Sequence, residues 1–132
     1  MNVRAVLVLV LLMLVPAGSY MSDGRFRDAR GNTDPDAVHV VVPDDLDALD
    51  PQVRDHLMRQ IEWARDDPQD ASRHATLGIA YAANARWLES RESFRMVLKL
   101  DPGEVLAKYH MAVATERLGD YDGTVELLRQ IT

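Results

Sequence analysis

The chain has no cysteine among its 132 residues. That absence excludes disulfide bonds, thiol nucleophiles and thiolate zinc sites, so the core has to be held by packing alone. The same absence excludes the acylated cysteine of a bacterial lipoprotein. No glycine-rich phosphate loop occurs, and the four histidines form no His-x-x-x-His pair with a carboxylate placed to complete a metal site. We therefore expect no metal, no cofactor and no enzymatic activity.

Basic residues are also few. Fifteen Lys and Arg stand against 21 Asp and Glu, which gives a net charge of −6. Because the chain lacks a basic patch, nucleic acid is not an expected partner. The acidic excess favours a soluble surface that resists non-specific association.

The N-terminus carries the one long apolar run. Residues 5–17 are apolar, follow Arg4, and lead into the small residues Ala17-Gly18-Ser19. This pattern is typical of a secretory signal peptide over residues 1–19, with cleavage before Tyr20. The alternative is an uncleaved anchor, because residues 5–22 form an uncharged run of 18, at the short limit for crossing a bilayer. We expect the rest of the chain to be exported, periplasmic or extracellular, or tethered to the membrane by residues 5–22 alone.

Residues 20–49 are interpreted as a polar, largely disordered linker. Most of this stretch has too few aliphatic residues to fold alone. It contains a short β-branched run, VHVVVP at Val38–Pro43, and a lone strand of this kind needs a partner edge.

From Asp50 onward the pattern is helical, and Asp-Pro steps separate the helices. These steps fall at Asp50-Pro51, Asp67-Pro68 and Asp101-Pro102, so that they are 17 and then 34 residues apart. Proline ends one helix or begins the next, and Asp is a good N-cap. The apolar periodicity then predicts an all-α fold of antiparallel helical hairpins, with helices at about 50–65, 70–83, 86–99, 104–117 and 120–131.

The 34-residue spacing brings similar residues into register. Gly78 and Ser90 are small, which lets two helices approach closely, and Tyr81 and Phe94 are large enough to fill the space beside them. Phe94 corresponds to Leu128 after one spacing. His74 lies on the same helical face as Tyr81, so we interpret it as a hydrogen-bonded core histidine rather than a metal ligand.

The order Leu77-Gly78-Ile79-Ala80-Tyr81, then Ser90, Phe94 and Pro102, resembles the tetratricopeptide repeat (TPR) family. The Gly-Asp-Tyr turn within Leu118–Leu128 is similar to the same family, although Ala112 and Thr115 replace the Gly and Tyr of the first unit. The resemblance implies a short TPR-like α-solenoid after the signal or anchor segment and linker. Its domain covers residues 50–132, with a half unit at 50–70 and repeats at 71–104 and 105–132.

In the TPR family the concave groove, lined by the first helix of each unit, usually binds a protein or peptide. The resemblance carries that role to mostly apolar positions, which suit an amphipathic helix or an extended hydrophobic segment. An alternative stays open, in which the chain's own Val53/Leu57/Ile61 helix or its VHVVVP run fills the groove. The predicted groove residues are Ala75, Ile79, Ala82, Leu106, Tyr109, Val113, Glu116 and Arg117.

The last helix is apolar enough to support self-association, through Val125, Leu127, Leu128 and Ile131. The sequence thus favours an exported adaptor that binds a protein partner without catalysis. The alternative is a membrane-anchored accessory subunit of an envelope assembly complex, whose repeats hold a larger enzyme.

Overall fold

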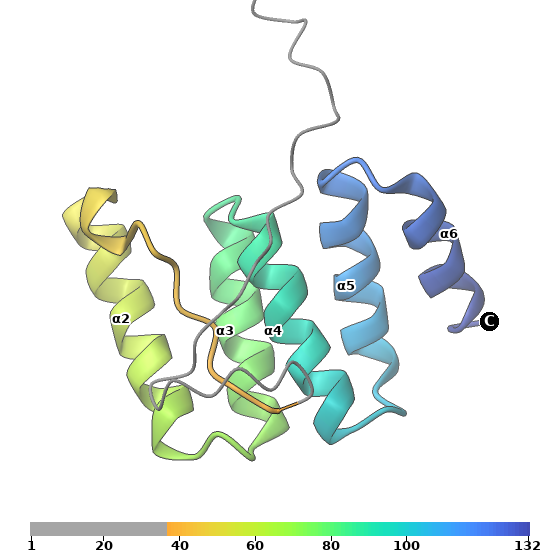
Figure 1. Ribbon diagram of the computed structural model, residues 1–132, viewed down its shortest axis with the longest axis horizontal. Helices are drawn as coiled ribbons and strands as arrows, with labels where there is room; N and C mark the ends of the chain where they lie inside the picture. The colour runs from red at the N-terminus through yellow and green to blue at the C-terminus, as the bar shows by residue number, and fades with distance from the viewer. Residues whose placement is uncertain (1–36) are drawn as a thin grey trace, which may run out of the picture.

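The computed structural model describes residues 37–132. Within this range the chain forms five α-helices and one 3-10 turn, with no strand: η1 (Leu46–Ala48), α2 (Pro51–Asp66), α3 (Ala71–Ala83), α4 (Trp87–Leu100), α5 (Val105–Arg117) and α6 (Tyr121–Arg129). Consecutive helices lie side by side and alternate in direction from α2 to α6 (Figure 1). The all-α architecture of helices joined by short turns is therefore confirmed.

The predicted signal or anchor segment, residues 1–19, lies outside the described residues. In the part of the chain that is described, no helix is both long and apolar enough to cross a membrane.

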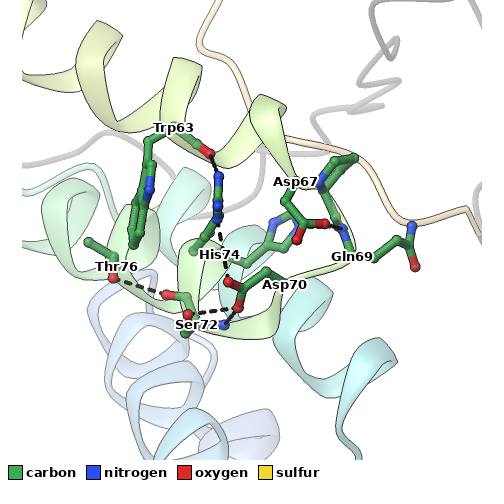
Figure 2. Close-up of polar contacts among 9 residues, drawn as sticks. Trp63, Asp67, Gln69, Asp70, Ser72, His74 and Thr76 are labelled. Atoms are coloured by element: carbon green, nitrogen blue, oxygen red, sulfur yellow. Dashed lines mark hydrogen bonds and ion pairs between the residues drawn. The ribbon is translucent and has the colours of Figure 1, made fainter.

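Acidic side chains cap four of the five α-helices. Asp50 accepts a hydrogen bond of 2.9 Å from the amide of Gln52, with Pro51 as the first helical residue. Asp70 accepts one of 2.8 Å from the amide of Ser72, and Figure 2 shows these two side chains in contact. Glu104 and Asp120 cap α5 and α6 in the same way. Each such cap stabilises its helix by about 1 kcal/mol. Because only a few residue types can form this cap, the helix starts could be predicted from the sequence.

In the first hairpin, side chains of α4 pack directly against the backbone of α3 at Gly78. A Cβ atom added at Gly78 would lie only 2.8 Å from Cε2 of Phe94. The buried hydroxyl of Ser90 donates a hydrogen bond of 2.9 Å to the carbonyl of Gly78. Tyr81 and Phe94 are buried beside this contact, as the alternation of small and large residues predicts.

The second hairpin, α5 and α6, is packed more loosely. The hydroxyl of Thr124 donates to the carbonyl of Asp120 in its own helix instead of bonding across to α5. Leu128 is 42% exposed, whereas Phe94, one 34-residue spacing earlier, is 1% exposed. No residue of α6 is buried, so this helix is held mainly along one side by α5.

Residues 37–49 pack against the helices rather than extending away from them (Figure 1). Val41 is completely buried in a cluster with Leu57, Ile61 and Tyr81. The hydroxyl of Tyr81 donates a hydrogen bond of 2.7 Å to the carbonyl of Val41. The linker expected over residues 20–49 therefore ends before residue 50, because the β-branched run finds an apolar helical surface and needs no strand edge.

His74 is a buried core residue, as predicted. Its Nε2 donates a hydrogen bond of 2.8 Å to the carbonyl of Pro68, and its side chain is fully buried. Burial lowers the pKa of His74 below its usual value because the imidazolium form loses its hydration. The residue is therefore a neutral hydrogen-bond donor that fixes the turn between α2 and α3.

Candidate protein-binding surface

Helix α3 has two apolar faces, and the described residues cover only one of them. His74, Leu77 and Tyr81 on the first face are completely buried. Ile79 on the other face is 50% exposed, with Ala75 and Ala82 partly buried beside it. A helix that is apolar on two faces ordinarily needs covering twice, so the second face is available for contact.

Helix α5 repeats this arrangement. Ala107, Ala112 and Thr115 are buried toward the core, while Leu106 and Tyr109 are 60% and 50% exposed. Val113 is partly buried, and Glu116 and Arg117 at the end of the helix are exposed.

A shared core joins the two helices. Ala75 of α3 and Met111 of α5 both pack against the buried cluster formed by Phe94, Val97 and Ala107. Ala75 therefore belongs partly to the core, and Ile79, Leu106 and Tyr109 supply most of the accessible apolar surface. We call the predicted groove residues together the α3–α5 face: Ala75, Ile79, Ala82, Leu106, Tyr109, Val113, Glu116 and Arg117.

Tyr109 is linked to the core through two successive aromatic contacts, first with His110 and then with Phe94. The ring of His110 stacks on buried Phe94, with centroids 4.9 Å apart and planes 9° from parallel. Tyr109 meets His110 edge to face, at 5.7 Å and 68°. Offset and edge-to-face pairs of this kind favour defined ring positions. The half-exposed Tyr109 ring therefore lies against His110, which in turn stacks on the core residue Phe94.

Arg117, the one cation of the α3–α5 face, is held by an aromatic ring. Its guanidinium lies 5.4 Å from the centroid of the Trp87 ring, in a cation–π contact. Such contacts contribute about 0.5–1 kcal/mol at exposed sites. A partner that engages Arg117 would meet a cation already placed over α4.

The alternative that the chain fills the α3–α5 face itself is not seen for residues 37–132. Val53, Leu57 and Ile61 pack with the VHVVVP run in the cluster around Val41 and Tyr81. That cluster lies on the buried face of α3, and Ile79 remains exposed. The N-terminal segment and α2 thus cover the first face of α3.

Several accessible residues were not found from the sequence. Val105, Leu118, Tyr121 and Trp63 are exposed. Trp63 carries the guanidinium of Arg73 at 5.1 Å from its ring centroid. This contact joins α2 to α3, and the Trp87–Arg117 contact joins α4 to α5. A sequence pattern reveals contacts at i+3 or i+4 within one helix, and neither of these contacts has that spacing. In the range 37–132 no group of His, Asp and Glu is arranged to hold a metal ion.

The structure divides the residues predicted for self-association. Leu127 of α6 and Ile131, two residues after it, are partly buried, whereas Val125 and Leu128 are exposed. The second pair is the more accessible to another molecule.

Comparison with known proteins gives one distant relative and no family assignment. No family model matches the chain, and no solved structure matches it. A segment of 67 residues, 51% of this chain, is 31% identical to Superkiller protein 3 of Schizosaccharomyces pombe, a TPR-containing protein. The chain spans about a twentieth of that relative's length, since the match covers 5% of it. The matched length is close to two 34-residue spacings, so the similarity supports a TPR-like helical repeat.

Proposed function

We propose that this chain is a helical-repeat adaptor that binds an apolar segment of a protein partner on the α3–α5 face. One observation carries the proposal: Ile79, Leu106 and Tyr109 are each at least half exposed on a packed helical scaffold, and no element of residues 37–132 covers them. Exposed apolar side chains on helices that share one core cluster are the kind of surface found at interaction sites. The similarity to a TPR-containing protein agrees with this role.

The chemistry of the face favours an amphipathic helix or an extended hydrophobic segment. Six of its eight positions are apolar or aromatic, and its only ionic residues are Glu116 and Arg117, side by side at the end of α5. Complete burial of a side chain of this size contributes about 1.5–3 kcal/mol. Ile79, Leu106 and Tyr109 are about half exposed, so covering each of them by a partner would contribute roughly half of that free energy. Together these contributions are enough for selective but reversible binding.

The test replaces residues of the face and follows capture of the partner. The partner is first recovered by crosslinking from the native membrane and exported fractions, and its affinity is then measured. Tyr109→Ala and Val113→Asp should each weaken binding by about tenfold or more, since an aromatic contact or an apolar one is lost. Helical circular dichroism should stay unchanged.

Tyr121→Ala is the matched control, because Tyr121 is an exposed tyrosine outside the α3–α5 face. It should bind the partner as the wild type does. Unchanged binding by Tyr109→Ala and Val113→Asp would refute the proposal.

We also propose that the adaptor is exported, on the pattern of residues 1–22. This rests on the sequence alone, because these residues lie outside the described part of the structure. The N-terminus of protein purified from its source tests it: a start at Tyr20 indicates cleavage and a free adaptor, whereas retained Met1 indicates an anchored subunit.

A further inference from the structure

Helix α6 carries an apolar stripe that residues 37–132 cover only in part. Tyr121, Val125 and Leu128 follow one another at i, i+4 and i+7, so they share one face of the helix. Tyr121 is 69% exposed and Val125 is 48% exposed. We call these three residues the α6 stripe.

The first hairpin shows what kind of element fits this position. Phe94 of α4 lies one 34-residue spacing before Leu128. Phe94 is buried because the next helix, α5, packs on it through Ala107 and Met111. The corresponding residue Leu128 is apolar and 42% exposed, so a further helix could pack on it as α5 packs on Phe94.

The charges beside the stripe indicate which helix fits. Asp122, Glu126 and Arg129 form a row at i, i+4 and i+7 along one edge of the stripe, with the acids toward the start of α6 and the arginine at its end. Glu126 and Arg129 already form an ion pair at 4.0 Å. A second α6 laid antiparallel across the stripe would place its Arg129 opposite Asp122 of the first copy. A parallel two-fold copy would instead put the two charged rows on opposite edges of the contact, where Asp122 of one copy and Arg129 of the other do not meet.

We propose that two copies of this chain associate through antiparallel packing of their α6 stripes, with a two-fold axis close to Val125. The interface is isologous, because each copy supplies the same apolar stripe and Asp122 of each copy faces Arg129 of the other at the two ends of the contact. Antiparallel helices also bring opposite ends of their helix dipoles together. With a nine-residue helix on each side the contact is small, so the dimer forms reversibly.

The absence of cysteine from these 132 residues allows a direct geometric test. A single Val125→Cys substitution lies near the axis and should form a disulfide between two copies under mild oxidation. Asp122→Cys and Arg129→Cys lie away from the axis on opposite sides. Mixed together they should crosslink to each other faster than either crosslinks to itself.

The control for random collision is Arg59→Cys, an exposed position on α2. Crosslinking of the α6 variants no faster than this control would overturn the proposal. Faster self-crosslinking of Asp122→Cys and Arg129→Cys than of their mixture would also overturn it, because that is the parallel arrangement.

A second experiment measures the dimer dissociation constant by sedimentation equilibrium. Leu128→Asp should raise the dimer dissociation constant by about tenfold, since it places a charge within the apolar contact. Val105→Asp, an exposed apolar position at the start of α5, should leave that constant unchanged. Equal association by wild type and Leu128→Asp, with helical content preserved, would assign the contact to another segment and overturn the proposal, as would a wild-type chain that stays monomeric.

Discussion

Ala85 and Gly119 both adopt a left-handed backbone, with φ of 55° and 84°, and they lie 34 residues apart in the chain. Each follows the first helix of its hairpin. The hydrogen bonds around them match as well: the amide of Arg86 donates to the carbonyl of Tyr81 at 2.9 Å, and the amide of Asp120 donates to that of Thr115 at 3.1 Å. Both turns therefore end a helix with the same left-handed cap, even though one uses alanine and the other glycine.

The difference between these two residues predicts a stabilising substitution. Ala85→Gly should raise the free energy of unfolding by about 0.5–1 kcal/mol, because glycine adopts positive φ without the steric cost that alanine bears. Gly119→Ala should lower it by a similar amount. Urea unfolding measures both. Ala83→Gly, in the last turn of α3, is the control and should destabilise the protein; if Ala85→Gly behaves like it, the two turns are not equivalent.

The contact between Gly78 and Phe94 predicts a large effect from a single methyl group. Gly78→Ala should lower the free energy of unfolding by about 1–3 kcal/mol, since the new Cβ would lie 2.8 Å from the Phe94 ring. This loss exceeds the gain of about 1 kcal/mol that alanine brings to a helix interior. Gly103→Ala is the matched control, because its nearest neighbour would be 3.5 Å away. A Gly78→Ala protein as stable as the wild type would contradict the close approach of α3 and α4.

The hydrogen bond from Tyr81 to Val41 predicts that one hydroxyl helps to hold the N-terminal segment. Tyr81→Phe leaves the buried carbonyl of Val41 without its donor and should cost about 1–2 kcal/mol of stability. Amides of residues 38–43 should exchange faster in that variant. Tyr109→Phe, half exposed, serves as the control and should change neither quantity. Unchanged exchange in Tyr81→Phe would show that burial of Val41 alone holds the segment.

His74 predicts a loss of stability in mild acid. Burial is the main cause of its lowered pKa; nearby His39 adds to it, while the Pro68 carbonyl and Asp70 oppose it. The unfolded chain binds a proton at this residue as the pH falls through 6.5, but the folded chain resists it, so stability declines below that pH. The slope is at most about 1.4 kcal/mol per pH unit for one histidine.

His74→Gln tests this origin, because glutamine can still donate to the Pro68 carbonyl but does not titrate. Urea unfolding at about pH 7.5 and about pH 5.5 should show a smaller difference for His74→Gln than for the wild type. His56→Gln, at an exposed position on α2, should keep the wild-type difference. An unchanged difference in His74→Gln would assign the acid sensitivity to other groups. The pKa of Asp45 is lowered, chiefly by its hydrogen bond from Arg86. Its contribution to stability is therefore lost only at a lower pH than that of His74, as the pH falls below 3.8.

The helices were predictable because the features that define them are local. An Asp or Glu cap, a proline at the first position and apolar residues at helical spacing each act within a few residues, as at Asp50, Pro51 and Asp70. The tight packing of Gly78 with Phe94 was also predicted from the sequence, because small and large residues recur at fixed positions in each unit.

The packing of residues 37–49 was not predictable in the same way. Val41 meets Tyr81 forty residues later in the chain, and a run of β-branched residues indicates a strand when its apolar neighbour is unknown. The site was predicted in part. Ile79, Leu106 and Tyr109 are exposed as a binding role requires, but Ala75 contributes to the core because α3 and α5 meet through Phe94. Whether the face binds a partner stays a prediction.

The most direct test of the proposed role places a photo-crosslinking amino acid at Ile79 or Leu106 of the chain. Arg59 on α2 is the control position. Irradiation in the native extract should yield the same adduct from positions 79 and 106 and not from 59, and Tyr109→Ala should abolish it. No shared adduct at 79 and 106, or an equal yield from 59, would contradict binding through the α3–α5 face.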